Sequence, residues 1–195
     1  FTFHRVLPAP DRLLAGEPYA DSFAERLDWI RDTLNVLALP DAVRRLQRGA
    51  LPARAACITF DDGYADNLTV AAPIMRERGI RPTVFVATGY LDGGLMFNDA
   101  ITEAMRAAPE HLDLTDFGLG LLELRDVDAR RAAIRSLVAE LKYRTAEERG
   151  PLAAEIFRRA VAVPPRGLML TTAQVQALRD VGVEIGAHTA THPIL

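Results

Sequence analysis

Two adjacent carboxylates follow an apolar run in the first half of the chain. Residues 55–60 (AACITF) are apolar and rich in β-formers, which predicts a strand buried on both faces; Asp61, Asp62 and Gly63 come directly after it. Gly63 permits a sharp turn that exposes both acids, and consecutive residues at a strand end point in opposite directions. The two acids can therefore take different partners. The plainer alternative is an Asp-Asp-Gly turn that caps the following helix.

Two of the four histidines stand close together near the end of the chain. His188 directly follows another apolar β-like run, 183–187 (VEIGA), and His192 precedes Pro193. In a helical turn, residues i and i+4 share one face, and two imidazoles in this spacing can bind one metal ion. The alternative is a pair of surface histidines in a loop before the proline.

Together, the two polar segments indicate a site more strongly than either does alone. In α/β folds the carboxyl ends of the strands form the ligand-binding edge, so both segments would converge on one mouth. One Asp and two His make a three-ligand metal set with an open position for water. The other Asp is then free to take a proton as that water attacks a carbonyl carbon. The pattern therefore indicates metal-assisted hydrolysis.

An α/β fold would bring these segments together. Short β-like runs alternate with helical patterns, which predicts a parallel sheet with right-handed crossovers, either doubly wound or closed into a barrel. The β-like runs are 1–7, 36–39, 55–60, 83–87 and 183–187. The helical patterns are 22–35, 41–47, 67–78, 98–107, 128–144, 146–161 and 173–181.

The middle of the chain departs from this alternation. Residues 94–167 carry helical patterns rich in Arg, Ala and Glu, with Pro151 breaking or restarting the last, while 113–120 is weakly patterned and is predicted to be a loop. We expect 94–167 to be a helical insertion within the domain. Because amphipathic helices commonly serve packing, a cover for the sheet is the plain interpretation. A wall of the substrate groove or a partner contact is the alternative.

Composition excludes several other classes of protein. The 195 residues are 49% hydrophobic and 25% charged, as in a globular domain with a sizeable core. The single cysteine, Cys57, excludes an intrachain disulfide framework and a cysteine-rich zinc module. With a net charge of −3 and no block of Lys or Arg, nucleic acid is not an expected partner. No apolar run reaches the roughly 18 residues of a transmembrane segment.

At this point the sequence resembles the polysaccharide deacetylase family, the carbohydrate esterase family 4 type with a NodB-like homology domain. The matching stretches are TFDDGYADN (59–67), RPTVFVATGYL (81–91) and GVEIGAHTATHP (182–193). The first and last are similar to the family's opening two motifs, in the right order, and FHRV (3–6) resembles the end of the first strand in many bacterial members. The resemblance implies a distorted (β/α) barrel, incomplete in this chain.

The resemblance also implies a role for each residue of the polar segments. Asp61 would be the catalytic base, and Asp62, His188 and His192 would hold a divalent metal ion, usually zinc. The implied reaction is hydrolysis of N-acetyl groups of an acetylamino-sugar polysaccharide or oligosaccharide, with release of acetate. The ion would polarise the acetyl carbonyl and stabilise the tetrahedral oxyanion.

Two further residues are implied neighbours of the site. Thr189 would hold the histidine-containing loop by hydrogen bonding. His4 lies at a strand end and can approach the same mouth, where the resemblance favours a supporting role over metal ligation.

The chain also departs from the family pattern. It ends at Leu195 without the three later motifs, which are an Arg-containing loop, an Asp/Trp segment and a Leu-x-His that supplies the general acid. His111 lies in the helical segment and Trp29 on the first helix, so neither replaces the missing acid or offers a sugar-stacking platform. We therefore expect residues 1–195 to be a polysaccharide deacetylase domain truncated before its C-terminal motifs, with little or no activity alone.

Two other functions stay open at this stage. One is hydrolysis of small cyclic amides or ureides by the same superfamily, and the other is a degenerate, non-catalytic deacetylase-like domain that binds saccharide. The location stays open between the cytoplasm and the envelope of a bacterial cell. An exposed strand edge beside 183–187 would drive pairing or disorder, which leaves a homo-oligomer open.

Overall fold

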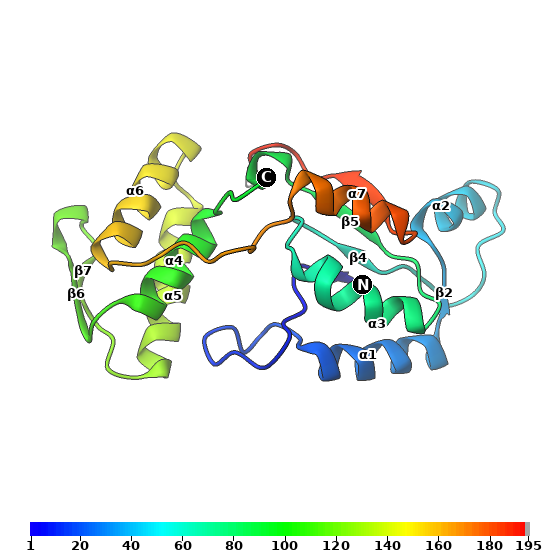
Figure 1. Cartoon of the computed structure of the whole chain (residues 1–195), viewed down its shortest axis with the longest axis horizontal. Coiled ribbons are helices and arrows are strands. Elements are labelled where there is room, and N and C mark those ends of the chain that lie inside the picture. The colour runs from blue at the N-terminus through cyan, green and yellow to red at the C-terminus, as the bar shows by residue number, and fades with distance from the viewer. Residues whose placement is uncertain (194–195) are drawn as a thin grey trace. The chain divides into compact units, whose positions relative to one another are not determined.

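A four-stranded parallel sheet positions the predicted site. The structure is a computed structural model that describes residues 1–193. Its main sheet has the order β1-β4-β5-β8, made of β1 (Thr2–Phe3), β4 (Thr59–Phe60), β5 (Thr83–Val86) and β8 (Glu184–Ala187) (Figure 1). Phe60 pairs with Phe3 on one side and with Val84 on the other. The carboxyl ends of all the strands therefore lie at the same edge.

The α/β class with a parallel sheet is confirmed, whereas closure of the sheet is not observed. Within residues 1–193, β1 and β8 are the outer strands of the main sheet and do not pair with each other. The distorted barrel that the resemblance implies therefore stays a prediction.

Three helices pack on this sheet through one hydrophobic cluster. They are α1 (Ala20–Thr33), α3 (Ala72–Glu77) and α7 (Thr172–Asp180) (Figure 1). On α1, Phe23, Leu27 and Ile30 are buried, as their spacing predicts. The ring of Phe23 packs edge-on against Phe60 of the central strand β4. The burial of these side chains holds the strands, and therefore the strand ends, in place.

The run 55–60 forms two short strands rather than the single strand its composition predicts. β3 (Ala55–Ala56) pairs in a separate two-stranded sheet with β2 (Asn35–Val36), which precedes α2 (Leu39–Gln47). β4 pairs in the main sheet. Between them the buried Ile58 already accepts a backbone hydrogen bond from Thr83 of the main sheet. The run is apolar throughout because both pairings are partly buried, so composition alone does not show the change of partner.

Residues Leu95–Arg166 form a second unit with a hydrophobic cluster of its own. It contains α4 (Phe97–Ala107), α5 (Val127–Lys142) and α6 (Ala146–Arg159), and α6 continues through Pro151 without a break. The first unit comprises Phe1–Gly94 and Gly167–His192. Whether the second unit is an insertion within one deacetylase domain stays a prediction.

The predicted loop 113–120 is right for residues 115–119, but its ends lie in strands. An antiparallel hairpin is formed by β6 (His111–Leu114) and β7 (Gly120–Glu123), and residues 115–119 connect the two strands. Along β6, exposed and buried side chains alternate, and Leu112 and Leu114 enter the core of the second unit. Four residues of alternation are a weak signal in a single sequence, which explains why the two strands were missed.

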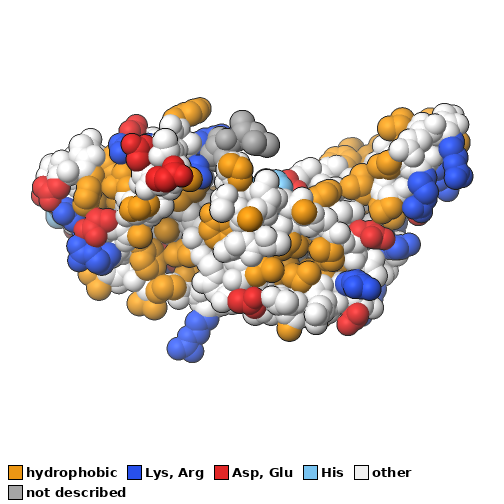
Figure 2. All heavy atoms as spheres, turned by 90° about the horizontal axis from the view of Figure 1, so that it is seen from above, with side chains coloured by type: hydrophobic (Ala, Val, Ile, Leu, Met, Phe, Trp, Pro, Cys, Tyr) orange, Lys and Arg blue, Asp and Glu red, His pale blue; other side chains and the backbone are white. Residues whose placement is uncertain are grey.

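The surface carries charges of both signs. Basic and acidic side chains both appear on the face drawn in Figure 2, in line with the small net charge of −3. Among the described residues, no helix combines the length and the apolar character needed to cross a membrane.

Candidate metal centre

Three side chains from two strand ends meet at one point. Nε2 of His188 lies 3.4 Å and Nε2 of His192 lies 3.2 Å from Oδ1 of Asp62. One ligand atom from each residue lies within 4.8 Å of the others, a spacing in which the three could hold a metal ion. Asp62 follows β4 and the histidines follow β8, so the parallel sheet brings these segments together although they are far apart in the sequence.

A tight turn separates the two acids. The Gly63 amide donates to the Asp61 carbonyl at 3.0 Å, and Asp62 at the centre of this turn has φ 75. This backbone is the rare, strained form of the three-residue turn, and such strain is common at functional sites. The Ala87 amide, which follows β5, donates to the Asp62 carbonyl at 3.1 Å. The turn is therefore anchored to the neighbouring strand. Asp62 is buried there, with only 3% of its surface exposed to solvent.

The loop that carries both histidines, residues 188–192, is irregular rather than helical; it is called the histidine loop below. Thr189 has φ 60 and His192 has φ 50, so the helical turn considered for the i, i+4 pair is not formed. The backbone N–H of His192 donates to Oγ1 of Thr189 at 3.0 Å, which is the loop-holding hydrogen bond expected of Thr189. The two rings still come together, with centroids 5.2 Å apart. The left-handed backbone at Thr189 and His192 thus brings the two imidazoles together, as a helical turn would also have done.

The donor set fits a divalent metal ion. Asp62 Oδ1 is buried and has no hydrogen-bond partner among the described residues, because neither imidazole meets hydrogen-bond geometry. An unpaired buried carboxylate oxygen is costly, and a cation bound there would remove that cost. Two imidazole nitrogens and one carboxylate oxygen suit zinc and similar ions. The histidine side chains are 33% and 25% exposed, which leaves the cluster open on one side.

Asp61 lies next to this cluster but outside it. The acid is half-buried, and its amide donates to the Phe3 carbonyl of β1 at 3.0 Å. No hydrogen bond or ion pair joins its carboxylate to another residue within 1–193. The two acids therefore differ in surroundings, as the opposite directions of neighbouring residues at a strand end predict.

A buried ion pair supports the turn after β4. Nε of Arg5 donates to Asp66 at 2.9 Å, and the Val6 amide donates to the same carboxylate at 3.2 Å. Burial raises the pKa of the Asp66 carboxyl, and Arg5 opposes this rise. Asn67 donates to the His4 carbonyl at 2.9 Å, at the start of a π-helical turn (Asn67–Ala71) that leads into α3. The resemblance covered Asp66 and Asn67 only as unassigned members of TFDDGYADN.

Glu17 is a residue near the site that sequence reasoning missed. Burial raises the pKa of its carboxyl; attraction to His4 and Arg5 lowers the pKa, and repulsion from Asp66 and Asp62 raises it. Glu17 therefore shares the electrostatic surroundings of Asp62. It lies in a loop between β1 and α1 with no pattern of its own, so nothing in the sequence marked it.

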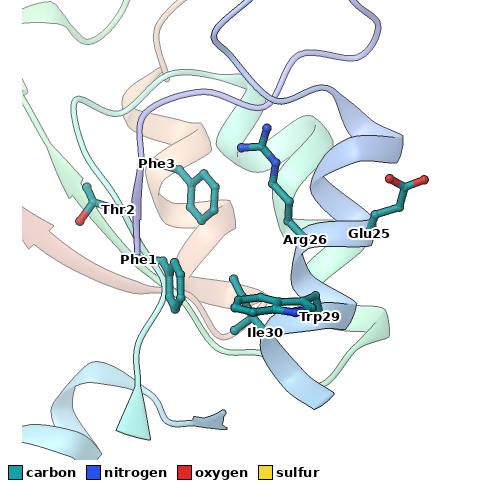
Figure 3. A pocket seen from close by; sticks show the side chains of 7 residues that line it. All are labelled: Phe1, Thr2, Phe3, Glu25, Arg26, Trp29 and Ile30. Atoms are coloured by element: carbon teal, nitrogen blue, oxygen red, sulfur yellow. The ribbon is translucent and has the colours of Figure 1, made fainter. Parts of the chain in front are cut away.

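The remaining candidates of the sequence lie outside the cluster. His4 is exposed at the end of β1 and is not part of the three-residue set. His111 lies on β6 of the second unit, 3.2 Å from Glu123. Trp29 lines a pocket of about 460 Å³ that Figure 3 shows between its ring, Phe1 and Ile30. None of the metal-set residues lines this pocket.

Comparison with known proteins identifies the family. The sequence profile described as "Polysaccharide deacetylase" matches residues 48–195, about three quarters of the chain. The chain belongs to the polysaccharide deacetylase family. The matched range contains all four residues to which the resemblance gives a catalytic or metal-binding role. No curated protein matches the chain at the required significance.

One solved deacetylase structure shares the fold, and a second is matched at a lower score. The chain is similar to the Streptococcus pyogenes deacetylase PplD, solved in complex with acetate, with TM-score 0.52 and 18% identity over 99% of this chain and 56% of PplD. It is also matched to the deacetylase domain of BpsB from Bordetella bronchiseptica, with TM-score 0.47 and 18% identity over 96% of this chain and 52% of that one. This polysaccharide deacetylase chain thus spans about half the length of both structures.

Proposed function

We propose that the chain carries the metal-binding part of an enzyme that removes N-acetyl groups from an acetylamino-sugar polysaccharide, with release of acetate. Membership of the polysaccharide deacetylase family supports this proposal. The observation that carries it is the buried Oδ1 of Asp62, which accepts no hydrogen bond from the described residues and lies between the two imidazoles at the carboxyl ends of β4 and β8. Such a donor set at the ligand-binding edge of an α/β sheet suits metal-assisted hydrolysis.

Asp62, His188 and His192 would hold the ion, with zinc the proposed metal. When bound there, the ion supplies a Lewis acid that lowers the pKa of water and polarises a carbonyl oxygen. Asp61 would act as the base, because it directly precedes Asp62 at the end of β4 and no hydrogen bond or ion pair within 1–193 takes up its carboxylate.

The proposed reaction balances with one water molecule. A water O–H bond breaks as Asp61 accepts the proton, and a C–O bond forms at the acetyl carbon. The C–N bond then breaks, acetate leaves, and the sugar nitrogen gains a proton to become an amine. The resemblance assigns this second proton transfer to the histidine of a Leu-x-His motif, which residues 1–195 do not contain. We therefore expect residues 1–195 alone to hydrolyse the N-acetyl group slowly.

The test is acetate release from N-acetylglucosamine oligomers. The protein encoded by the complete gene is assayed with zinc, beside an Asp61→Asn variant and a His111→Ala control whose histidine lies in the second unit. We expect acetate from the parent and the control, and a loss of about 100-fold or more in Asp61→Asn, since general-base catalysis commonly contributes that much. Equal rates in the parent and Asp61→Asn would contradict the role of Asp61.

Two further arms separate the alternatives. Hydrolysis of small cyclic amides or ureides, but not of the oligomers, would show that the substrate is a small amide and not a polysaccharide. Binding of oligomers without turnover of either substrate would indicate a non-catalytic domain. Residues 1–195 are assayed alone in parallel, and a rate equal to that of the complete protein would refute the need for the further motif.

A further inference from the structure

The last residue of β5 and the segment after it hold the histidine loop at four consecutive residues, 188–191. The His188 amide donates to the Val86 carbonyl at 2.9 Å, and the Thr88 amide donates to the Thr189 carbonyl at 3.2 Å. Two more contacts follow: the Gly89 amide donates to the Ala190 carbonyl at 2.8 Å, and the Tyr90 hydroxyl donates to the Thr191 carbonyl at 3.1 Å. These bonds extend the β5–β8 pairing beyond the strands to the loop that carries both imidazoles.

Gly89 makes the closest of these approaches possible. A Cβ atom built on Gly89 would lie 2.4 Å from the Ala190 carbonyl oxygen and 3.2 Å from its carbon. Both are backbone atoms, so no side-chain rotation relieves the overlap. Gly89 does not have a positive φ, so its need for glycine comes from this close approach and not from its own backbone conformation.

We propose that the turn Thr88–Tyr90 is the positioning element of the metal centre, with Gly89 and the Tyr90 hydroxyl as positioning residues for His188 and His192. The inference rests on the proposed metal site. Restoring an ordinary contact at Gly89→Ala requires Ala190 to move by about 1 Å, from 2.4 Å to the 3.4 Å of normal van der Waals contact. Ala190 lies between the two histidines, so the shift moves their rings relative to Asp62 Oδ1. Ligand positions must hold within a few tenths of an ångström for tight binding.

The chain offers a matched control for this substitution. Gly16 lies in the same unit, has no positive φ, and a Cβ built on it would meet nothing within 4 Å. Gly16→Ala therefore adds the same methyl group to the chain without touching the histidine loop. Tyr90→Phe provides a milder change, because it removes only the hydroxyl that donates to Thr191.

The experiment measures the Zn²⁺ dissociation constant of the parent and the three variants by competition with a chromophoric chelator, together with the melting temperature of each zinc-free protein. We expect Gly89→Ala to bind zinc about 10- to 100-fold more weakly, the range seen when supporting contacts of metal ligands are lost. Tyr90→Phe should lose a few-fold, and Gly16→Ala should match the parent. The zinc-free melting temperature of Tyr90→Phe should stay near that of the parent.

The outcomes separate this inference from the metal site itself. If the parent binds zinc and both Gly89→Ala and Tyr90→Phe bind it equally tightly, the positioning role is wrong and the metal site stands. If Gly89→Ala fails to fold, an unchanged zinc affinity in Tyr90→Phe overturns the proposal and a weakened one supports it. If the parent itself binds no zinc, the metal site and this inference fall together.

Discussion

Replacing Asp62 with asparagine separates the metal-binding role of this side chain from its structural role. The carboxylate is 5% exposed, and its Oδ1 has no hydrogen-bond donor among the described residues. The backbone at φ 75 accepts Asn as readily as Asp. In zinc-free protein, Asp62→Asn removes a buried charge at nearly constant volume, so we expect the variant to melt no lower than the parent.

With zinc present, the parent should instead melt at a higher temperature than Asp62→Asn. A ligand that binds only the folded state stabilises it by about 2.7 kcal/mol at a free concentration 100-fold above Kd. In a chain of 195 residues each kcal/mol raises Tm by roughly 2–4 °C, so the parent should gain about 5–11 °C. If the variant binds 100-fold more weakly, the same zinc concentration equals its Kd and contributes only about 0.4 kcal/mol. Its Tm should then rise by less than about 2 °C.

Scanning calorimetry with zinc and with a chelator measures both effects. His111→Ala is the control, because this exposed histidine of the second unit tests for surface binding of zinc. The control should gain as much Tm on zinc addition as the parent. An equal zinc-induced rise in the parent and Asp62→Asn would refute the assignment of Asp62 as a ligand. A zinc-free variant that melts several degrees lower would show instead that the carboxylate stabilises the fold.

Three further predictions concern stability. The folded-state pKa of Glu17 is raised above 4.5, so its ionisation costs stability as the pH rises through the folded pKa; Glu17→Gln should therefore gain stability over the zinc-free parent at pH 7 and lose that gain at about pH 4, by urea denaturation. Hydrogen bonds from Arg78 lower the pKa of Asp28, so Asp28→Asn should be less stable than the parent at pH 7 and equal to it once acid has protonated Asp28. Phe23 is fully buried against Phe60, and Phe23→Ala should cost about 3–5 kcal/mol of unfolding free energy; a loss below 1 kcal/mol would contradict the packing.

Local patterns predicted the elements whose burial is periodic. The stripe on α1 identified Phe23, Leu27 and Ile30, and the apolar run 83–87 identified β5, because a helix face or a doubly buried strand leaves its period in the sequence. The sequence predicted one strand where the structure has β3 and β4. No polar residue or turn signal at Ile58 marks the boundary, and the change of sheet partner is a long-range property.

The site shows the same division between local and long-range information. Strand ends and side-chain chemistry were enough to predict that one Asp of the pair lies close to His188 and His192, whereas the choice of Asp62 over Asp61 came from the family resemblance. The left-handed backbone of the histidine loop was not predictable from a spacing of four, because contacts with the segment after β5 determine it. Glu17 and the Arg5–Asp66 pair were missed for a similar reason: their proximity to the site depends on how a loop without pattern returns to the sheet.

The turn at Asp62 also limits the substitutions that could remove the proposed metal ligand over evolutionary time. At φ 75 Gly, Asn and Asp are accommodated at lower cost than other residues, whereas a β-branched residue would further strain the turn that anchors β4 to β5. A lineage that loses the proposed metal site would therefore pass most easily through Asn or Gly at this position. The same two substitutions are the natural starting points for engineering a metal-free variant of this scaffold.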